Sequence, residues 1–537
     1  VSGRTESDLG SLSHNESIKG DSLEAIPLPP PYSGQRDDLP LVMIGSPYAE
    51  KVINFNLDDG AAKLRHGDSV HSTGGTSFVF ALATYGFGSS QKLFGVNSDG
   101  GTLKVIDCST AGAVSVAYNP GGPSDDTEIH TLFFNNVLTF FGEIDWTPGS
   151  LGCPSYNGSV WGSSGYTYPT ITVPFGGTSF KNRAYIIERN GTKYAYSAIN
   201  AISGLTVEVD LAQVMSAKGY LYGIRSVSLS EGLEQENVLC FVFNTGEVLA
   251  YSGSYPDSSD WKLIGRFIIS PPIYYNAFID ARGDSFVITK TGLISLRTLF
   301  TQGVEIATQQ ALSGSIRNRW KQIVNGSFAG SEMIIRGMYD QINDRVVISF
   351  PALITETGAL DTDKSLRLVF SFKTESWAEH HVDQDNGNLA SSGVVFYKNA
   401  PYYGVWEGVM KMEGASDFID ASASGGSNNG YPYELTSAPI ASGRTYVSRA
   451  DGLDLIMESD MHDITNYQFI SDLGVTESVA QKLPSNTALT LSKPNVNMGI
   501  EGSYIQFKVS GNTTSGKTVG LNIYGVNVWT QSGRSPR

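Results

Sequence analysis

The chain has 537 residues, including 59 glycines, 26 tyrosines and 25 phenylalanines, but only 3 cysteines. Its 53 Asp and Glu exceed its 37 Lys and Arg, so the net charge is −16. A chain this acidic has no general electrostatic affinity for nucleic acid, because such affinity depends on cationic side chains that neutralise phosphates. The sequence contains no run of eighteen apolar residues, so we expect no membrane span.

The three cysteines, Cys108, Cys153 and Cys240, are far apart in the sequence. Their number is odd and their spacing matches neither a disulfide framework nor a CxxC metal site. We therefore expect each to be a small buried side chain.

Residues 1–40 are predicted to form an extended N-terminal arm. The first 26 residues are mostly Ser, Glu, Gly and Asp, and the proline-rich sequence "IPLPPPYSGQRDDLPL" follows them. The polar part cannot bury enough apolar surface to offset its ordering entropy. The prolines favour an extended backbone that can dock on a neighbour.

Residues 180–299 contain three hairpin-like units, each of which turns at a glycine. In the first, the dipeptide Asn190-Gly191 lies between the apolar runs "AYII" and "YAYSA", and this dipeptide tolerates the positive φ angles of a tight turn. The second and third units turn at Gly246 and Gly292, again between apolar runs. These patterns predict three β-hairpins.

Similar turns recur outside this block. They lie near residues 135, 190, 246, 292, 343 and 399. The spacing is about 50 residues, the length at which propeller blades repeat. We therefore predict an all-β chain whose residues 41–430 form a β-propeller of about six blades. A sandwich array or a solenoid is the alternative. The one expected exception to β structure is a single helix or loop turn within residues 211–220.

The rhythm of turns stops near residue 430, after the linker-like sequence "ASASGGSNNG". Strand-like runs such as "SYIQFKVSG" and "LNIYGVNVW" follow it. A Gly- and Ser-rich stretch of this kind is typical of a domain boundary. Residues 431–537 are therefore predicted to form a separate, β-sandwich-like C-terminal module.

The segments "NRAYIIE", "GEVLAYSGSYPDSSDWKLIGRF" and "GDSFVITKTGLISL", in that order, resemble the tail nozzle proteins of short-tailed bacteriophages, the tail tubular protein B group. Residues 29–67 are similar to the N-terminal part of that group. The matching positions, which we call the N-terminal motif, are Arg36, Asp37, Ala49, Asn54, Phe55, Arg65 and Gly67. The long polar leader and the loop at residues 351–365 depart from the pattern and leave the docking partner open.

This resemblance implies a structural virion protein and not an enzyme, with no cofactor. It implies a homohexameric ring under the portal and the head-to-tail adaptor, in contact with other tail proteins or fibres. The ring would gate and conduct genome DNA without reading its sequence. Such a protein is assembled in the host cytoplasm and resides in the virion tail. We add the hypothesis that the ring lumen is acidic or neutral so that DNA slides through it, which a continuous Lys/Arg stripe would contradict.

The alternative function is a propeller that binds or cleaves surface glycans during host contact. A glycosidase needs two carboxylates about 5–10 Å apart in a central pocket. The candidates Asp99, Asp145, Asp284 and Asp340 are scattered, and the repeated sialidase Asp-box is absent from the sequence.

The tryptophans bear on the same alternative, because a lectin stacks such rings on sugars. Trp261, Trp377, Trp406 and Trp529 each lie within strand-like sequence. This context favours a packing wedge between blades over a sugar-binding platform.

Two further segments are candidates for other roles. Residues 380–388, "HHVDQDNGN", combine imidazoles with carboxylates, but they lack the glycine and the terminal glutamate of an EF-hand loop, which favours a solvated turn. The loops at residues 351–365 and 149–165 show little regular pattern, and we predict that they contact partners or gate the channel.

Overall fold

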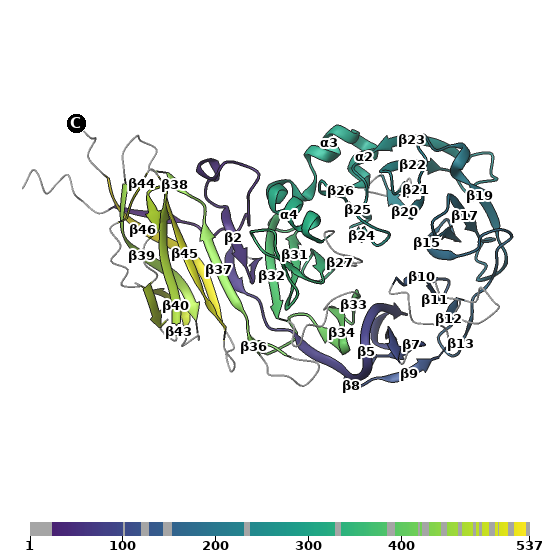
Figure 1. Ribbon diagram of the computed structural model, residues 1–537, viewed down its shortest axis with the longest axis horizontal. Helices are drawn as coiled ribbons and strands as arrows, with labels where there is room; N and C mark the ends of the chain where they lie inside the picture. Colours follow the sequence, from purple (N-terminus) through teal and green to yellow (C-terminus); the bar gives the residue numbers. More distant parts are fainter. Residues whose placement is uncertain are drawn as a thin grey trace, which may run out of the picture.

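The computed structural model is a ring of small β-sheets with a second β body beside it (Figure 1). The structure describes residues 24–58, 60–99, 102–119, 128–142, 153–229, 237–327, 335–383, 393–416, 419–421, 429–441, 448–459, 464–475, 479–482, 486–492, 500–502, 504–513 and 520–532.

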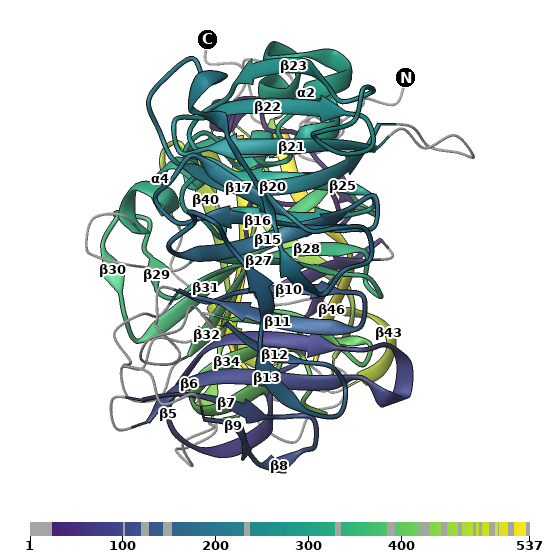
Figure 2. The ribbon, with the colours of Figure 1, turned by 90° about the vertical axis from the view of Figure 1, so that its right-hand side faces the viewer.

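Within these residues, seven groups of paired strands follow one another around the ring, and each contacts the next. We call them blades 1 to 7. The all-β propeller expected from the sequence is therefore confirmed. Figure 2 shows strands of blades 1 to 4 from the outer side of the ring. Blade 1 contains β5 (Ser69–Tyr85), β6 (Lys92–Asp99), β7 (Thr102–Asp107) and β9 (Ser115–Tyr118), and blade 2 contains β10 (His130–Phe134), β11 (Val137–Phe141), β12 (Pro154–Tyr156) and β13 (Trp161–Ser163). Blade 3 contains β15 (Pro174–Phe180), β16 (Arg183–Glu188), β17 (Lys193–Tyr196) and β19 (Val207–Asp210). Blade 4 contains β20 (Leu221–Ser228), β21 (Asn237–Phe243), β22 (Glu247–Ser252) and β23 (Lys262–Ile268).

Blades 5 to 7 complete the ring. Blade 5 contains β24 (Phe278–Ala281), β25 (Asp284–Ile288) and β26 (Leu293–Ser295). Blade 6 contains β27 (Arg336–Asp340), β28 (Arg345–Phe350), β31 (Lys364–Ser371) and β32 (Ser376–Asp383). Blade 7 contains β33 (Val394–Tyr397), β34 (Ala400–Lys411) and the first part of β5. Middle strands are buried on both faces because neighbouring blades cover them, and all six residues of β28 are buried.

Strand β5 closes the ring. Its residues 69–78 pair with β34 in blade 7, and its residues 79–85 pair with β6 in blade 1. One long strand thus joins an early and a late segment of the propeller, so that the last blade contains strands from both.

The seven blades exceed the expected number of about six by one. Each of the six recurring turns lies within one of blades 2 to 7, for example Asn135-Asn136 between β10 and β11. None of the six lies in blade 1, where β5 leads to β6 through Gly86 and a short 3-10 turn at Gly88–Ser90, and β6 pairs with β7 as far as Asp99 and Thr102. The repeat seen in the sequence therefore did not include blade 1, whose first strand, β5, also belongs to blade 7.

A helical segment after blade 5 was not expected. It consists of α2 (Leu296–Gln302), α3 (Val304–Gln309), η4 (Leu312–Ile316) and α4 (Arg317–Ser327). The buried residues Trp320, Ile323 and Val324 share one face of α4 at the i, i+3, i+4 spacing typical of a helix. Residues 211–220 contain only a 3-10 turn, η3 (Leu211–Gln213), capped by Asp210. None of the helices in the described residues is long and apolar enough to cross a membrane.

The second body is a two-sheet sandwich, and both sheets include strands from the N-terminal part of the chain. The propeller therefore begins at β5, whereas residues 41–430 had been assigned to it. One sheet contains β1 (Glu24–Leu28), β3 (Phe55–Asp58), β4 (Ala61–Leu64), β39 (Ser448–Ser459), β43 (Asn486–Ser492), β44 (Ile500–Gly502) and β46 (Leu521–Ser532). The other contains β2 (Ala49–Ile53), β37 (Pro432–Ser437), β38 (Ile440–Ala441), β40 (Ile464–Ser471), β41 (Gly474–Val475), β42 (Val479–Lys482) and β45 (Tyr504–Asn512).

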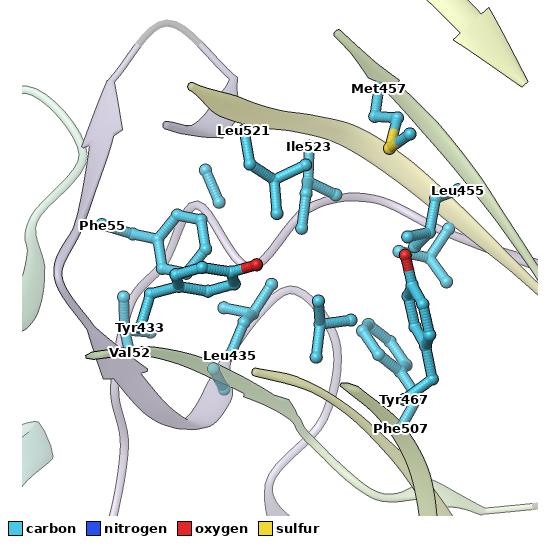
Figure 3. Close-up of a cluster of buried hydrophobic side chains, with 14 of the residues drawn as sticks. Val52, Phe55, Tyr433, Leu435, Leu455, Met457, Tyr467, Phe507, Leu521 and Ile523 are labelled. Carbon is cyan, nitrogen blue, oxygen red and sulfur yellow. The ribbon is translucent and has the colours of Figure 1, made fainter. Parts of the chain in front are cut away.

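The sandwich core lies between these sheets (Figure 3). Phe55 and Tyr433 face each other from opposite sheets, with ring centroids 5.9 Å apart in an edge-to-face arrangement. The expected N-terminal arm is thus partly built into this body, because β1 pairs with β46 along its whole length. Residues 1–23 lie outside the described part.

The sandwich and the propeller share a continuous sheet. Strand β2 pairs with β37 of the sandwich and, through Ile53 and Glu379, with the outer strand β32 of blade 6. Figure 1 shows β2 between these two strands. Backbone hydrogen bonds therefore link the two bodies directly.

Candidate functional site

Five residues of the N-terminal motif form two clusters at the junction of propeller and sandwich, while Ala49 and Phe55 belong to the sandwich core. Arg36 and Asp37 lie at the start of α4, whereas Asn54, Arg65 and Gly67 lie beside the last strands of the propeller. The resemblance singled these residues out as one motif. In the structure they belong to two separate clusters.

Asp37 caps helix α4. Its carboxylate accepts hydrogen bonds from the backbone N–H groups of Asn318 and Arg319, which lie in the first turn of the helix. A negative charge at a helix N-terminus is favourable. Burial raises the pKa of Asp37, although these two hydrogen bonds oppose the shift. Arg36 forms an ion pair with Asp38 at 2.7 Å and does not join the cap.

Arg65 is the centre of the second cluster and is completely buried. Its Nη1 and Nη2 donate to the two carboxylate oxygens of Asp420 at 2.9 and 2.7 Å, and its Nε donates to Asn54 Oδ1 at 2.9 Å. The guanidinium also lies over the ring of Tyr431, 3.9 Å from the centroid. Asn54 can reach Arg65 because its backbone has a φ of 61°, a left-handed conformation that asparagine tolerates.

Asp68 extends this cluster into blade 6. Its carboxylate accepts hydrogen bonds from Tyr403 Oη and the Glu413 N–H, and it pairs with Arg367 Nη1 at 2.7 Å. Burial raises the pKa of Asp68, but the positive charges of Arg367 and Arg65 outweigh it and lower the pKa below its usual value. The carboxylate is therefore held ionised.

A third ion pair completes the buried network. Arg345 contacts Asp340 at 2.9 Å and Glu413 at 2.9 Å. Among the described residues, the network contains the three arginines 65, 345 and 367 against the four carboxylates 68, 340, 413 and 420, so its charge is nearly balanced. His380 is buried beside it, and burial together with the nearby arginines lowers its pKa far enough to keep it neutral.

This ionic network joins strands that are distant in the chain. It connects the segment after β4 with β28, β31 and β32 of blade 6, with β34 of blade 7, and with β35 (Ile419–Asp420), which pairs with β36 (Asn429–Gly430). Its side chains are buried except for Glu413, which is 18% exposed, and Arg367 Nε and Nη2 have no hydrogen-bond acceptor in the described residues. Breaking a buried ion pair is costly because it leaves a charge unpaired. The network is therefore a structural joint between the two bodies.

A pocket of about 730 Å³ opens beside this joint, between α4, β2, β32, the short strand β29 (Leu353–Ile354) and the residues 355–357 that follow it. The loop at residues 351–365, predicted to contact partners, forms part of its wall. Glu379 lies in the pocket and pairs with Arg319 at 2.8 Å. Burial raises the pKa of Glu379, but hydrogen bonds from His381 and Arg319 outweigh it and lower the pKa well below its usual value.

The other carboxylates of this pocket are also engaged. Glu50 accepts a hydrogen bond from Gln506, Glu356 pairs with Lys51, and Asp37 caps α4. Glu356 is 62% exposed, so water screens its ion pair with Lys51.

A second cavity, of about 190 Å³, lies on the axis of the ring. Six of the seven blades contribute to its wall. Its polar side chains are His130, Thr131, Arg225, Asn276 and Arg336, and no Asp or Glu lines it among the described residues. The scattered carboxylate candidates do not converge here, since Asp340 pairs with Arg345 and Asp284 accepts hydrogen bonds from Ser285, Ser295 and Arg297. Asp145 lies outside the described residues.

The tryptophans expected to pack between strands differ in their surroundings. Trp377 is fully buried in blade 6 and donates from Nε1 to the Leu312 carbonyl at 2.7 Å. Trp261 is half-buried and stacks on Tyr251 with ring centroids 5.3 Å apart. Trp406 departs from the expectation, because its side chain is 38% exposed. The pairing of β34 with β5 shifts register between Trp406 and Gly408, an irregularity that re-aims side chains.

The glycines of the three predicted hairpin turns differ in their backbone φ angles. All three predicted hairpins are present, as β16–β17, β21–β22 and β25–β26. Gly246 has a φ of +87°, and a Cβ there would clash with the carbonyl oxygen of Ile269. Gly191 and Gly292 do not have positive φ angles, so the conformational demand at the first turn falls on Asn190, whose φ is 54°.

The remaining candidates are only partly visible. Of residues 380–388, His380 lies beside the ionic network and His381 contacts Glu379 at 3.2 Å, while residues 384–388 lie outside the described part. The described residues contain no cluster of three metal-ligating side chains. In the predicted loop at residues 149–165, residues 154–163 include β12 and β13 of blade 2, so this part is regular structure. The cysteines are confirmed as free and buried.

The arrangement as a whole defines a β-propeller protein with a sandwich attached to one blade. No family model and no curated protein sequence matches the chain. Among solved structures it is similar to YCF48 bound to D1 peptide, with 11% identity, a TM-score of 0.36, and coverage of 65% of this chain and 97% of that chain. It is also similar to BBS1N in complex with ARL6DN, with 9% identity, a TM-score of 0.37, and coverage of 65% and 97%.

A third similar structure is the exo-β-1,3-galactanase Pc1,3Gal43A from Phanerochaete chrysosporium with galactose. The identity is 9%, the TM-score is 0.24, and the match covers 74% of this chain and 95% of that chain. Similarity at this level carries no argument about activity. The propeller assignment rests on the order and contacts of the sheets.

Proposed function

We propose that the chain is a structural protein of the tail nozzle type found in short-tailed bacteriophages. In this role it forms a homohexameric ring beneath the head-to-tail adaptor, contacts other tail proteins or fibres, and conducts genome DNA. The order of the motifs in residues 180–299 and the N-terminal motif motivate the proposal.

The observation that carries the proposal is the joint between propeller and sandwich. A shared sheet and a largely buried ionic network, centred on Arg65 and Asp420, hold the two bodies together. A scaffold that must transmit force along a tail needs such a fixed connection between its parts. An isolated propeller with a tethered module would need no such network.

The carboxylates of the junction pocket are paired with protein groups, which supports a structural role over the glycosidase alternative. Asp37, Glu50, Glu356 and Glu379 in the junction pocket all have protein partners. The axial cavity is lined by arginines instead of carboxylates within the described residues. We therefore assign no catalytic step to either cavity.

The DNA path belongs to the assembled ring and is distinct from the axial cavity of one propeller. At about 190 Å³ that cavity is smaller than the roughly 300–1,000 Å³ of sites for drug-sized ligands, and a duplex cannot enter it. With a charge of −16 per chain, a lumen formed by several copies would bind DNA weakly, which favours passage over retention.

Co-sedimentation tests this proposal. The purified chain is mixed with portal–adaptor complexes from a phage of the matching host, and glycan release from host-surface polysaccharide is assayed in parallel. We expect stable association with the adaptor and no released sugar. Release of sugar without adaptor binding would favour the glycosidase alternative.

A further inference from the structure

The axial cavity of the propeller gathers cationic and amide groups from separate blades. Arg225 comes from β20 of blade 4, Asn276 from the segment before β24 of blade 5, and Arg336 from β27 of blade 6. Other side chains of the wall, including Leu82, Phe278 and Val394, are apolar. Polar groups that converge from separate elements on one cavity are typical of a ligand site.

Arg225 is held in position, but its hydrogen-bonding capacity is not used up. Nη1 donates to the Ile224 carbonyl at 2.8 Å, and the guanidinium lies 4.4 Å from the centroid of the Phe278 ring. Nε has no hydrogen-bond acceptor in the described residues. The nearest carboxylate, Asp280, is 3.8 Å away and 69% exposed, so water screens much of that attraction.

Asn276 provides an independent sign of a missing ligand. Its side chain is only 9% exposed, and its Nδ2 has no acceptor within the described part of the chain. Burying an amide donor without an acceptor is costly, typically about 1–3 kcal/mol. An acceptor placed in the cavity would remove this cost.

Among the described residues, the charged side chains in the cavity wall are cationic. Arg225 and Arg336 line the cavity, whereas Asp280 and Glu128, which is 3.3 Å from Arg189, lie outside the lining. Burial lowers the pKa of Arg336 to about 10, although Glu128 raises it. A guanidinium whose pKa is lowered in this way gains from an additional anion.

We propose that the axial cavity is a binding site for a small oxyanion, with Arg225, Asn276 and Arg336 as its donors. Phosphate and sulfate are the simplest ligands of this class, because guanidinium groups bind their oxygens through charge-assisted hydrogen bonds. The cavity of about 190 Å³ has room for such an ion and several waters. The site goes beyond the proposed tail function and does not depend on it.

A bound oxyanion would tie together blades 4, 5 and 6. Because it binds the folded ring and not the unfolded chain, it raises the apparent stability of the ring with increasing anion concentration. The site is thus a structural one, in which the bound anion stabilises the contact between neighbouring blades.

Thermal unfolding and calorimetry with inorganic phosphate test the proposal on the whole chain. Ionic strength is held constant with chloride, because sulfate and phosphate also stabilise proteins in general through exclusion from their surfaces. We expect a saturable rise in Tm and a measurable heat of binding. The Asn276→Asp variant, which adds a negative charge, should weaken phosphate binding at least tenfold, and Arg225→Gln should do the same.

Lys262→Gln is the matched control, since Lys262 is an exposed cation on the outer strand β23 of the same blade as Arg225. It should bind phosphate like the wild type. A rise in Tm that does not saturate, or that is equal in the wild type, Asn276→Asp and Lys262→Gln, would overturn the proposal. If Arg225→Gln does not fold, the comparison of Asn276→Asp with Lys262→Gln decides the outcome.

Discussion

Arg65 and Asp420 are 355 positions apart in the chain, yet they form a bidentate ion pair in which both side chains are buried. Their contacts of 2.9 and 2.7 Å join the segment after β4 to β35, where the chain passes from propeller to sandwich. This pair is the central contact of the joint on which the proposed function depends.

Removal of Arg65 should destabilise the protein strongly. Arg65→Gln leaves Asp420 buried without its cation, and we expect a loss of about 3–5 kcal/mol in the free energy of unfolding. Arg282→Gln is the control, because Arg282 is half-exposed in its ion pair with Asp344 and should contribute about 1 kcal/mol or less. Urea unfolding of both variants measures the difference, and equal losses would contradict a structural role for the network.

Glu379 should make stability fall at acidic pH. Burial raises its pKa, but His381 and Arg319 outweigh burial and lower the pKa below its usual value of 4.5. Its contribution is therefore present above about pH 4.5 and is lost as the pH falls further towards the pKa of the folded state. Glu379→Gln should be less stable at pH 7 and lose less stability than the wild type between pH 5 and pH 3.

The control for this pH series is Glu305→Gln, an exposed position on α3. Its melting temperature should follow that of the wild type at each pH. If Glu379→Gln also follows the wild type from pH 7 to pH 3, the ion pair with Arg319 does not contribute to stability.

Substitution of Gly246 should cost more than substitution of Gly191, although both glycines occupy predicted hairpin turns. Gly246→Ala forces an L-residue to a φ of +87° and places its Cβ against the Ile269 carbonyl. We expect a loss of about 2 kcal/mol or more, compared with less than about 1 kcal/mol for Gly191→Ala. Denaturant midpoints test this order, and a larger cost at Gly191 would show that the turn geometry differs.

The cysteines should be unreactive in the folded protein. Burial raises the pKa of Cys108 and of Cys153 to about 12, and it raises that of Cys240 as well. Because the thiolate is the reactive form, a thiol reagent at pH 8 should label all three only after unfolding in guanidinium. Rapid labelling without denaturant would mean that the blades open readily.

Local turn chemistry made most of the propeller predictable from the sequence. Asn190, Asp344 and Asn399 all have positive φ angles in tight turns, so the sequence carries a direct signal for their hairpins. Strand β5 gave no such signal. It serves two blades through a change of partner along one continuous run, and no local pattern reports that change.

The joint was much less predictable. Asn54 and Arg65 were singled out through the resemblance, but their partner Asp420 was not. A buried ion pair between distant residues leaves no local pattern, because each member resembles an ordinary surface charge in the sequence. The same holds for Arg225 and Arg336, which meet in the axial cavity only because the ring closes.

Electron-microscopy class averages of the purified chain, alone and mixed with portal–adaptor complexes, test the proposed function most directly. The proposal predicts a rotationally symmetric ring of about six copies with an axial channel, attached beneath the adaptor. Single particles without symmetry in both samples, with no density added to the adaptor, would contradict it.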